Sequence, residues 1–317
     1  MIQNAVRTDG PVRLAALECA ASCIVSALDI RGFNPRYFLL GYWHIGYYDG
    51  MLMSVRNMKW IDLAYEYGIQ TGMTSGSLES LNDLLDGGDM AIILCKASKL
   101  RFFPESMLGF ESAGFYHCVL LYGRSGLHDS FHVTDPVAGF TGLITADELA
   151  EASVRSGEFV YCRLRFDADY RRPEERDSFR RASAANLAAY RKSGAKAFER
   201  FRADVADSMG WEAANRRSWT DRNNIALSAI SRMRTLVWQS YVDTGLLSEE
   251  ERAEGNVMIG EVVRAWMNIN MQLVKIGSRS AVAGLAEIIR RQLETVERAE
   301  IRLLEYLAAK ELLPNEN

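Results

Sequence analysis

Long hydrophobic runs and paired cysteines are both missing from this chain, and each absence excludes a class of protein. No stretch of its 317 residues is long and apolar enough for a transmembrane helix. The apolar region after Arg13 is interrupted by Glu18, which argues against a secretory signal. The five cysteines form no Cys-x-x-Cys pair, and their odd number argues against a disulfide framework or a thiolate zinc site. We therefore expect a cytoplasmic protein with reduced thiols, no membrane contact and no bound metal.

A large charge of either sign is also missing. The chain carries 37 Lys and Arg against 41 Asp and Glu, a net charge of −4. This near balance argues against nucleic acid as a partner, because polyanion binding requires an excess of positive charge. With 48% hydrophobic and 25% charged residues, the composition is that of a folded protein long enough for two domains.

One of the few cysteines stands where a helix is predicted to begin. Small residues surround Cys19, and apolar side chains then recur at helical spacing up to Gly32, a typical C-terminal stop. The free amides and the dipole of a first helical turn stabilise a thiolate, which is the nucleophilic form of cysteine. Cys23 lies one turn further along the same face, without the helix start, and is expected to pack in the core.

A histidine and an acid follow on two predicted neighbouring strands. His117 is the second residue of the run 116–122, a turn follows, and the next run ends at Asp135 before Pro136. Strand alternation places His117 on one face and Cys118 on the other, so Cys118 is expected to be structural. The competing histidines, His128 in the turn and His132 on the second strand, are expected at the surface.

The order of these pieces resembles the papain-like cysteine enzymes. The resemblance is closer to the acyltransferases typified by the butirosin-biosynthesis protein and more distant to the double-glycine leader peptidases. The matching pieces cover roughly the first half of the chain, and they are Glu18-Cys19-Ala20-Ala21-Ser22-Cys23, Gly87-Gly88-Asp89-Met90-Ala91-Ile92-Ile93-Leu94, Tyr116-His117-Cys118-Val119-Leu120-Leu121-Tyr122-Gly123 and Val133-Thr134-Asp135-Pro136.

The resemblance implies a catalytic triad. Cys19 would attack a carbonyl, His117 would transfer protons, and Asp135 would orient the imidazole. The Cys19 amide would supply one oxyanion donor. The peptidases often place a glutamine six residues before the cysteine as the second donor, whereas this chain has Arg13 there. Ala20 also replaces the glycine of the leader peptidases.

The same resemblance implies an acyl transfer that forms an amide in secondary metabolism. The donor would be a phosphopantetheine thioester on an acyl carrier or peptidyl carrier protein, the acceptor a small amine, and no other cofactor would be needed. Two alternatives stay open: a cytoplasmic papain-like peptidase or amidase, and a catalytically inactive papain-like binding module.

Two further segments near the predicted triad have two interpretations each. The aromatic run 37–48 is either a core segment or the wall of a substrate pocket, and its pocket candidates are Tyr42, Trp43, His44 and Tyr47. The run 96–114 is long for a connection in a compact domain. It is either a lid over the thiol or a loop with its own packing.

The composition and the periodicity of the sequence change near residue 167. Helix-forming residues with apolar positions at helical spacing predict helices over about 174–206, 221–244, 249–276 and 281–312. We therefore predict an α+β protein. Residues 1–166 form a papain-like catalytic domain in which a central cysteine-bearing helix packs on an antiparallel sheet, and residues 167–317 form an α-helical bundle. The apolar stripes of that bundle make a homodimer possible.

Positive charge gathers at the start of the helical half. Residues 171–202 contain ten Arg or Lys and four acidic residues, an excess of +6 in a chain of net charge −4. Such a run is either a solvated helix face or a docking surface for an acidic carrier protein. The docking interpretation rests on Arg171, Arg172, Arg176, Arg180 and Arg181.

Overall fold

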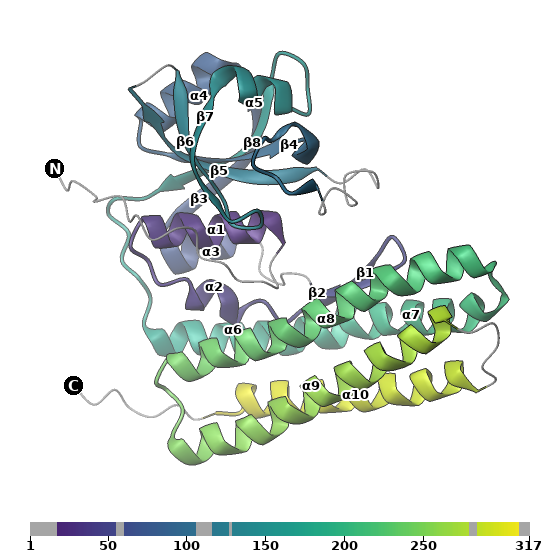
Figure 1. Cartoon of the computed structure of the whole chain (residues 1–317). Helices are drawn as coiled ribbons and strands as arrows, with labels where there is room; N and C mark the ends of the chain where they lie inside the picture. Colours follow the sequence, from purple (N-terminus) through teal and green to yellow (C-terminus); the bar gives the residue numbers. More distant parts are fainter. Residues whose placement is uncertain (1–17, 55–59, 106–115, 127–128, 279–283, 311–317) are drawn as a thin grey trace. The chain divides into compact units, whose positions relative to one another are not determined.

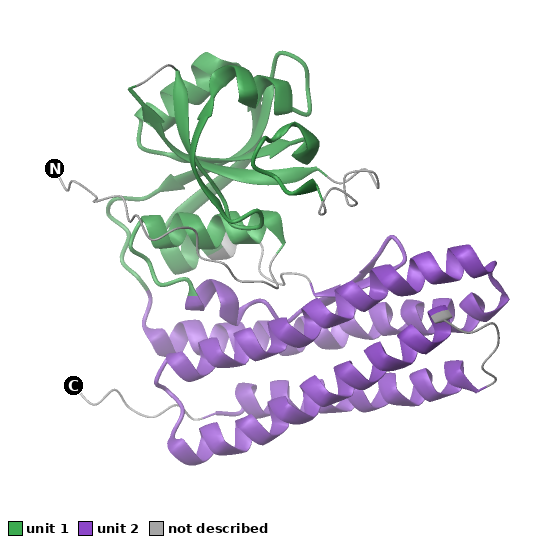
Figure 2. Cartoon of the chain, viewed as in Figure 1, with its two compact units in different colours: residues 1–35, 60–172 green, residues 36–59, 173–317 purple. Residues whose placement is uncertain are grey.

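The computed structural model describes residues 18–54, 60–105, 116–126, 129–278 and 284–310. The chain forms two compact units (Figure 2), one from residues 1–35 and 60–172 and the other from residues 36–59 and 173–317. The last boundary lies close to the expected one at 166/167. Residues 36–59 differ from the expected division, because they belong to the helical unit although the sequence on both sides belongs to the first.

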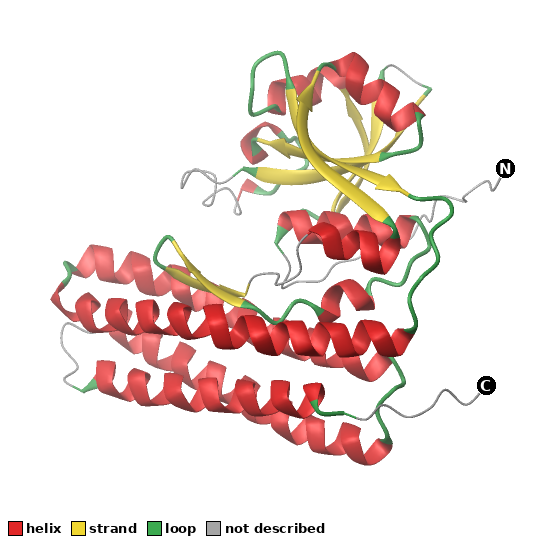
Figure 3. Ribbon diagram, turned by 180° about the vertical axis from the view of Figure 1, so that it is seen from behind, coloured by secondary structure: helices red, strands yellow, loops and turns green. Residues whose placement is uncertain are grey.

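The first unit is built on one antiparallel sheet of six strands in the order β3-β8-β4-β5-β6-β7. The sheet curves strongly (Figure 3). Its strands are β3 (Ile69–Gly76), β4 (Met90–Cys95), β5 (His117–Ser125), β6 (Ser130–Asp135), β7 (Phe140–Thr145) and β8 (Phe159–Phe166). Both faces of β4 are buried, which agrees with its continuous run of apolar residues.

Helices cover this sheet from two sides (Figure 1). On one side lie α4 (Leu78–Asp86) and α5 (Ala146–Ala152), whose Leu81 and Leu149 pack in a core with β4, β5 and β6. On the other lie α1 (Cys19–Ile30), which contacts β4, β5 and β6, and α3 (Trp60–Tyr67), which contacts β3. A short 3-10 turn, η1 (Ala97–Lys99), follows β4.

The helix predicted at the first cysteine is confirmed. Helix α1 begins at Cys19, and the residue before it, Glu18, is extended and contributes no side-chain cap. Cys23 and Leu28 are fully buried. The helix stops where Gly32 adopts a φ of +77°, a left-handed conformation that glycine reaches without strain. Burial of its apolar face therefore fixes α1 on the sheet, and this fixes the position of Cys19, the first residue of the helix.

The second unit is mainly helical, as predicted. Its elements are α2 (Arg36–Leu40), β1 (Ile45–Tyr48), β2 (Met51–Ser54), α6 (Glu175–Ala189), α7 (Ala195–Asp207), η4 (Ser208–Gly210), α8 (Ala213–Asp243), α9 (Glu249–Ser278) and α10 (Leu285–Ala308). A π-helical turn, η3 (Tyr190–Gly194), joins α6 to α7 inside one predicted helix. Within this unit α2 packs on α6 and α8, and the β1-β2 hairpin packs on α7 and α8. In the described part of the chain, no helix combines the length and apolarity required to span a bilayer.

A buried ion pair lies in the core of the helical unit. Glu300 of α10 accepts hydrogen bonds from Arg234 Nε at 2.7 Å and Nη2 at 3.1 Å, and both side chains are fully buried. The indole of Trp266 donates to the same carboxylate at 2.5 Å. The guanidinium carbon lies 4.6 Å from the ring centre of Trp43. Two charges are thus held away from water by one another and by aromatic neighbours.

Candidate active site

The first turn of α1 carries the candidate nucleophile. Cys19 is the first residue of the helix and is the one partly exposed cysteine, whereas Cys23, Cys95, Cys118 and Cys162 are buried. The amides of a first helical turn have no partner within the helix. This position therefore offers the sulfur both access to a substrate and a positive electrostatic environment.

The register of β5 and β6 brings the histidine and the acid together. Leu121 pairs with Val133 across the two strands. Since side chains alternate along a strand, His117 and Asp135 lie on the same face as that pair, as diagonal neighbours. His117 Nε2 lies 2.7 Å from Asp135 Oδ2. The hairpin of β5 and β6 thus places the histidine of one strand beside the acid of the next.

The Asp135 carboxylate is fully buried, and both of its oxygens have hydrogen-bond partners. Its Oδ1 accepts hydrogen bonds from the backbone amides of Val137 and Ala138, each at 3.0 Å, while Oδ2 faces the imidazole. A buried carboxylate requires such partners, because it has lost its hydration. The turn after β6 therefore fixes the acid, and the acid fixes the ring plane of His117.

His117 and Cys118 are the neighbours that shift the pKa of the Cys19 thiol. The hydrogen bond from the Cys118 thiol lowers the pKa of Cys19, burial opposes this, and the hydrogen bond and charge of His117 lower it further, to about 5. Burial lowers the pKa of His117, but its hydrogen bonds to Asp135 and Cys19 outweigh burial and raise it to about 9. Between these values the pair is a thiolate and an imidazolium.

Cys118 is buried on β5, in agreement with its expected structural position. Its thiol is also the largest influence that lowers the pKa of Cys19, a role that the sequence did not indicate. Cys23 and Cys95 have other partners, since their thiols donate to the carbonyls of Cys118 and His117, each at 3.6 Å. Strand alternation within β5 contains no signal for an influence on α1, which packs against this strand.

Aromatic rings anchor the segment after β4 beside the histidine. The ring of Phe103 lies 4.6 Å from that of His117. Phe102 stacks on Phe140 of β7 at 4.0 Å. Residues 106–114 of the expected lid lie outside the described residues, as do His128 and the oxyanion candidate Arg13, so their roles stay predictions. His132 is partly exposed on β6, in agreement with the expected surface position.

The four candidate pocket residues belong to the helical unit, whereas Cys19 belongs to the first unit. Tyr42 and Trp43 are buried in its core. Tyr47 donates a hydrogen bond to Asp204 of α7. Burial and the charge of Arg234 lower the pKa of His44. Core packing, the first of the two interpretations of this run, therefore describes Tyr42 and Trp43, and contact with a substrate stays a prediction for all four.

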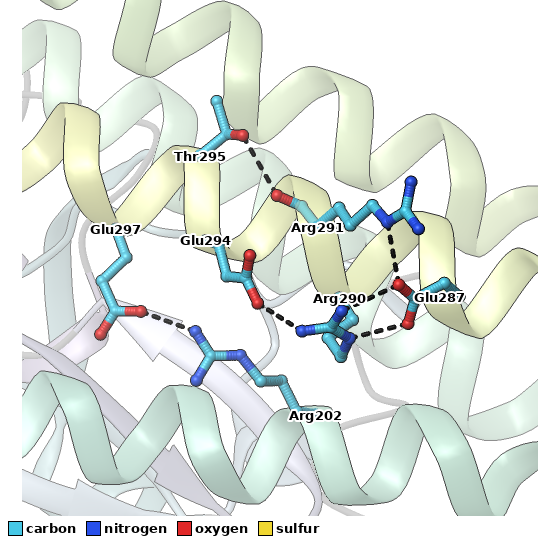
Figure 4. A network of polar contacts seen from close by, with 7 residues as sticks. All are labelled: Arg202, Glu287, Arg290, Arg291, Glu294, Thr295 and Glu297. Atoms are coloured by element: carbon cyan, nitrogen blue, oxygen red, sulfur yellow. Dashed lines mark hydrogen bonds and ion pairs between the residues drawn. The ribbon is translucent and has the colours of Figure 1, made fainter.

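The basic stretch is divided between the two units. Arg171 and Arg172 end the first unit, and Arg176, Arg180 and Arg181 lie on α6 of the second. Further along, Arg202 of α7 pairs with Glu297 of α10 at 2.6 Å (Figure 4), and Arg191 pairs with Glu305. Some of the positive charge is therefore neutralised within the helical unit. The remaining stretch is compatible with both interpretations.

The described residues contain no group of three or more His, Cys, Asp or Glu side chains arranged to hold a metal ion. The candidate site has a thiol, an imidazole and a carboxylate, the set of groups that serves in nucleophilic acyl transfer. No protein-family model matches the chain, and no curated protein is significantly similar to it in sequence. Any functional conclusion therefore rests on the site itself and on the resemblance of its motifs.

Proposed function

We propose that this protein is a cysteine-dependent acyltransferase that forms an amide through an acyl-Cys19 intermediate. The observations that support it are a cysteine at a helix start whose pKa is lowered, in part by His117, and the 2.7 Å hydrogen bond between the His117 imidazole and the buried Asp135 carboxylate. A thiolate that is already formed near neutral pH needs no separate base for its attack.

The first half-reaction loads the enzyme. The Cys19 thiolate attacks the carbonyl of a thioester donor and a tetrahedral intermediate forms, with its oxyanion facing the Cys19 amide at the start of α1. The bond between the carbonyl carbon and the donor sulfur then breaks. The imidazolium of His117 gives its proton to the departing thiolate, which leaves Cys19 acylated and His117 neutral.

The second half-reaction releases the product. An amine attacks the acyl-Cys19 carbonyl and loses a proton to neutral His117. The bond between carbonyl carbon and Cys19 sulfur breaks, which yields an amide and restores the thiolate and imidazolium. Asp135 stabilises the imidazolium whenever His117 carries the proton, because its carboxylate is 2.7 Å from Nε2 and is held in place by the turn amides.

The choice of donor and acceptor follows the motif resemblance to the butirosin-type acyltransferases. Exchange of one thioester for another requires little free energy, and amide formation then makes the transfer favourable. The proposed donor is an acyl group on the phosphopantetheine of an acyl carrier or peptidyl carrier protein, and the proposed acceptor is a small amine. Arg171, Arg172, Arg176, Arg180 and Arg181 are the proposed contacts for the acidic carrier.

Intact-protein mass spectrometry after incubation with acyl-carrier thioesters tests the proposal. We expect a mass gain equal to the acyl group in the wild type and in Cys23→Ala, and no gain in Cys19→Ala. Addition of an amine should remove the acyl group and yield the amide. A mass gain that persists in Cys19→Ala contradicts the proposed nucleophile.

The same samples separate the alternatives. Release of a free carboxylic acid at the same rate with and without amine identifies a hydrolase. Absence of any acylation, together with alkylation of Cys19 as slow as that of a buried thiol, identifies an inactive binding module.

A further inference from the structure

Helix α9 has an exposed apolar side as well as a buried one. Met267, Met271 and Val274 follow one another at spacings of four and three residues, so they form a row along one side of the helix. These residues are 55%, 54% and 52% exposed, whereas Trp266 and Leu273 are fully buried. The core of the helical unit therefore uses one side of α9 and leaves the exposed row outside.

Helix α8 widens this row into a patch. The short connection 244–248 makes α8 and α9 antiparallel neighbours. Asn270 of α9 donates a hydrogen bond to Ser228 Oγ of α8 at 2.8 Å. One turn away from this contact on each helix, Ile225 comes level with Val274, and Ile225 is 58% exposed. Exposed apolar side chains that gather on one face mark a surface that binds another protein.

A hollow lies beside the exposed row, between α9 and α10. Its volume is about 290 Å³, and its lining includes Ala265 and Asn268 of α9 and Thr295 and Ala299 of α10. The two alanines leave space that longer side chains would fill. Because a cavity of about 150 Å³ can hold a benzene molecule, this hollow has room for one long apolar side chain from outside.

We propose that a second copy of this chain covers this face, with the two α9 helices packed antiparallel about a two-fold axis that passes near Asn268. Such an axis places each residue before Asn268 opposite the residue equally far after it in the other copy. Met271 of one copy then lies opposite Ala265 of the other, over the hollow. The inference goes beyond the proposed acyl transfer and does not depend on it.

The charges beside the row agree with this register. Glu261 and Lys275 lie seven residues before and seven residues after Asn268, so each Glu261 faces Lys275 of the other copy. A parallel arrangement would instead place like charges opposite each other. Glu261 also pairs with Arg302 of its own chain, and a carboxylate can accept hydrogen bonds from both cations. Shape and charge are thus both self-complementary, which favours a second copy over an unrelated partner.

Sedimentation velocity of the full chain over a range of concentrations tests the inference. We expect the wild type to form a dimer. Met271→Glu places an unpaired charge over the hollow and should weaken dimerisation by about 100-fold or more. The matched control Met73→Glu changes a methionine of β3 that is 58% exposed, and it should dimerise as the wild type does.

Charge reversal tests the register. Lys275→Glu should weaken the dimer, because a carboxylate would then face Glu261 of the other copy, and Glu261→Lys should weaken it for the same reason. The double variant should regain the dimer. Far-ultraviolet circular dichroism checks that each variant is folded, and the wild-type measurement decides by itself if one is not.

Three results would overturn the inference: a wild type that is monomeric at every concentration, a dimer that Met271→Glu leaves unchanged, or a double charge variant that dimerises no better than the single ones.

Discussion

Each oxygen of the Asp135 carboxylate has a different task. Oδ1 holds the turn through the amides of Val137 and Ala138, and Oδ2 holds the imidazole of His117. The carboxylate therefore cannot rotate without breaking hydrogen bonds on both sides. A fixed acceptor on Nε2 leaves the opposite side of the ring for the Cys19 sulfur.

Replacement of this acid by its amide tests the ion pair. In Asp135→Asn, the side-chain oxygen can keep the two turn amides, and the NH2 group then faces His117 Nε2, where a protonated ring also carries hydrogen. We expect the pKa of His117 to fall below about 9 and that of Cys19 to rise above about 5. Acylation rate measured against pH should show a narrower plateau, with a loss of roughly 10²-fold or more at its centre. An unchanged profile would contradict the role of Asp135.

The neighbour of the nucleophile gives a second test at this scale. Because the Cys118 thiol is the largest influence lowering the pKa of Cys19, Cys118→Ala should move that pKa upward, and Cys118→Ser should not. Iodoacetamide labelling of Cys19 across pH measures this, with a wild-type midpoint near 5. Cys95→Ala is the matched control, since that thiol bonds the His117 carbonyl. Equal labelling midpoints in all four proteins would contradict the influence of the Cys118 thiol on the pKa of Cys19.

Residue chemistry was partly readable from the sequence. A cysteine before a helical apolar pattern, and a histidine and an acid at two strand ends, predicted the three side chains that the structure brings together. Cys118 was not predictable in the same way, because its role depends on where the end of α1 meets β5. That meeting is a property of tertiary packing, which spacing along one strand does not encode.

At the scale of elements, the sheet and the helices followed from periodicity, but the assignment of the aromatic run did not. Its buried side chains Tyr42 and Trp43 pack in the core of the helical unit. An apolar segment predicts burial and says nothing about which core receives it. The Asn223 amide of α8 also donates to the Gly50 carbonyl at 2.9 Å, a contact between segments far apart in the sequence.

The buried ion pair of the bundle gives a prediction at this scale. Arg234→Met leaves the Glu300 carboxylate buried without its cation, and we expect a loss of about 3–5 kcal/mol in the free energy of unfolding of the helical unit. The double variant Arg234→Met with Glu300→Leu removes both charges and should lose less than either single variant. Urea unfolding followed by far-ultraviolet circular dichroism measures this. A strictly additive double variant would contradict the coupling.

At the scale of the molecule, the chain passes between its two units three times, at 35/36, 59/60 and 172/173. Compositional change revealed the last passage, since it separates a mixed sequence from a helical one. The first two flank a short segment whose aromatic composition suits either unit. Amino-acid composition therefore locates a domain boundary only where the composition itself changes.

This topology predicts how fragments behave. A fragment that ends at Arg172 keeps α2 and the β1-β2 hairpin but loses α6 and α8, against which they pack. We expect it to aggregate, because buried side chains such as Trp43 and Leu52 become exposed. The same fragment with residues 36–59 replaced by a flexible Gly/Ser linker should remain monodisperse in size-exclusion chromatography. Aggregation of both fragments to the same extent would contradict this account.

The inserted segment also determines what a single proteolytic nick can do. A cut after Arg172 leaves two polypeptides, and the N-terminal one still threads residues 36–54 into the helical unit through the Asn223 and Asn186 amides. The nicked halves should therefore co-elute under native conditions and separate only in denaturant. Elution at the position of the native protein would then not show that the chain is uncut.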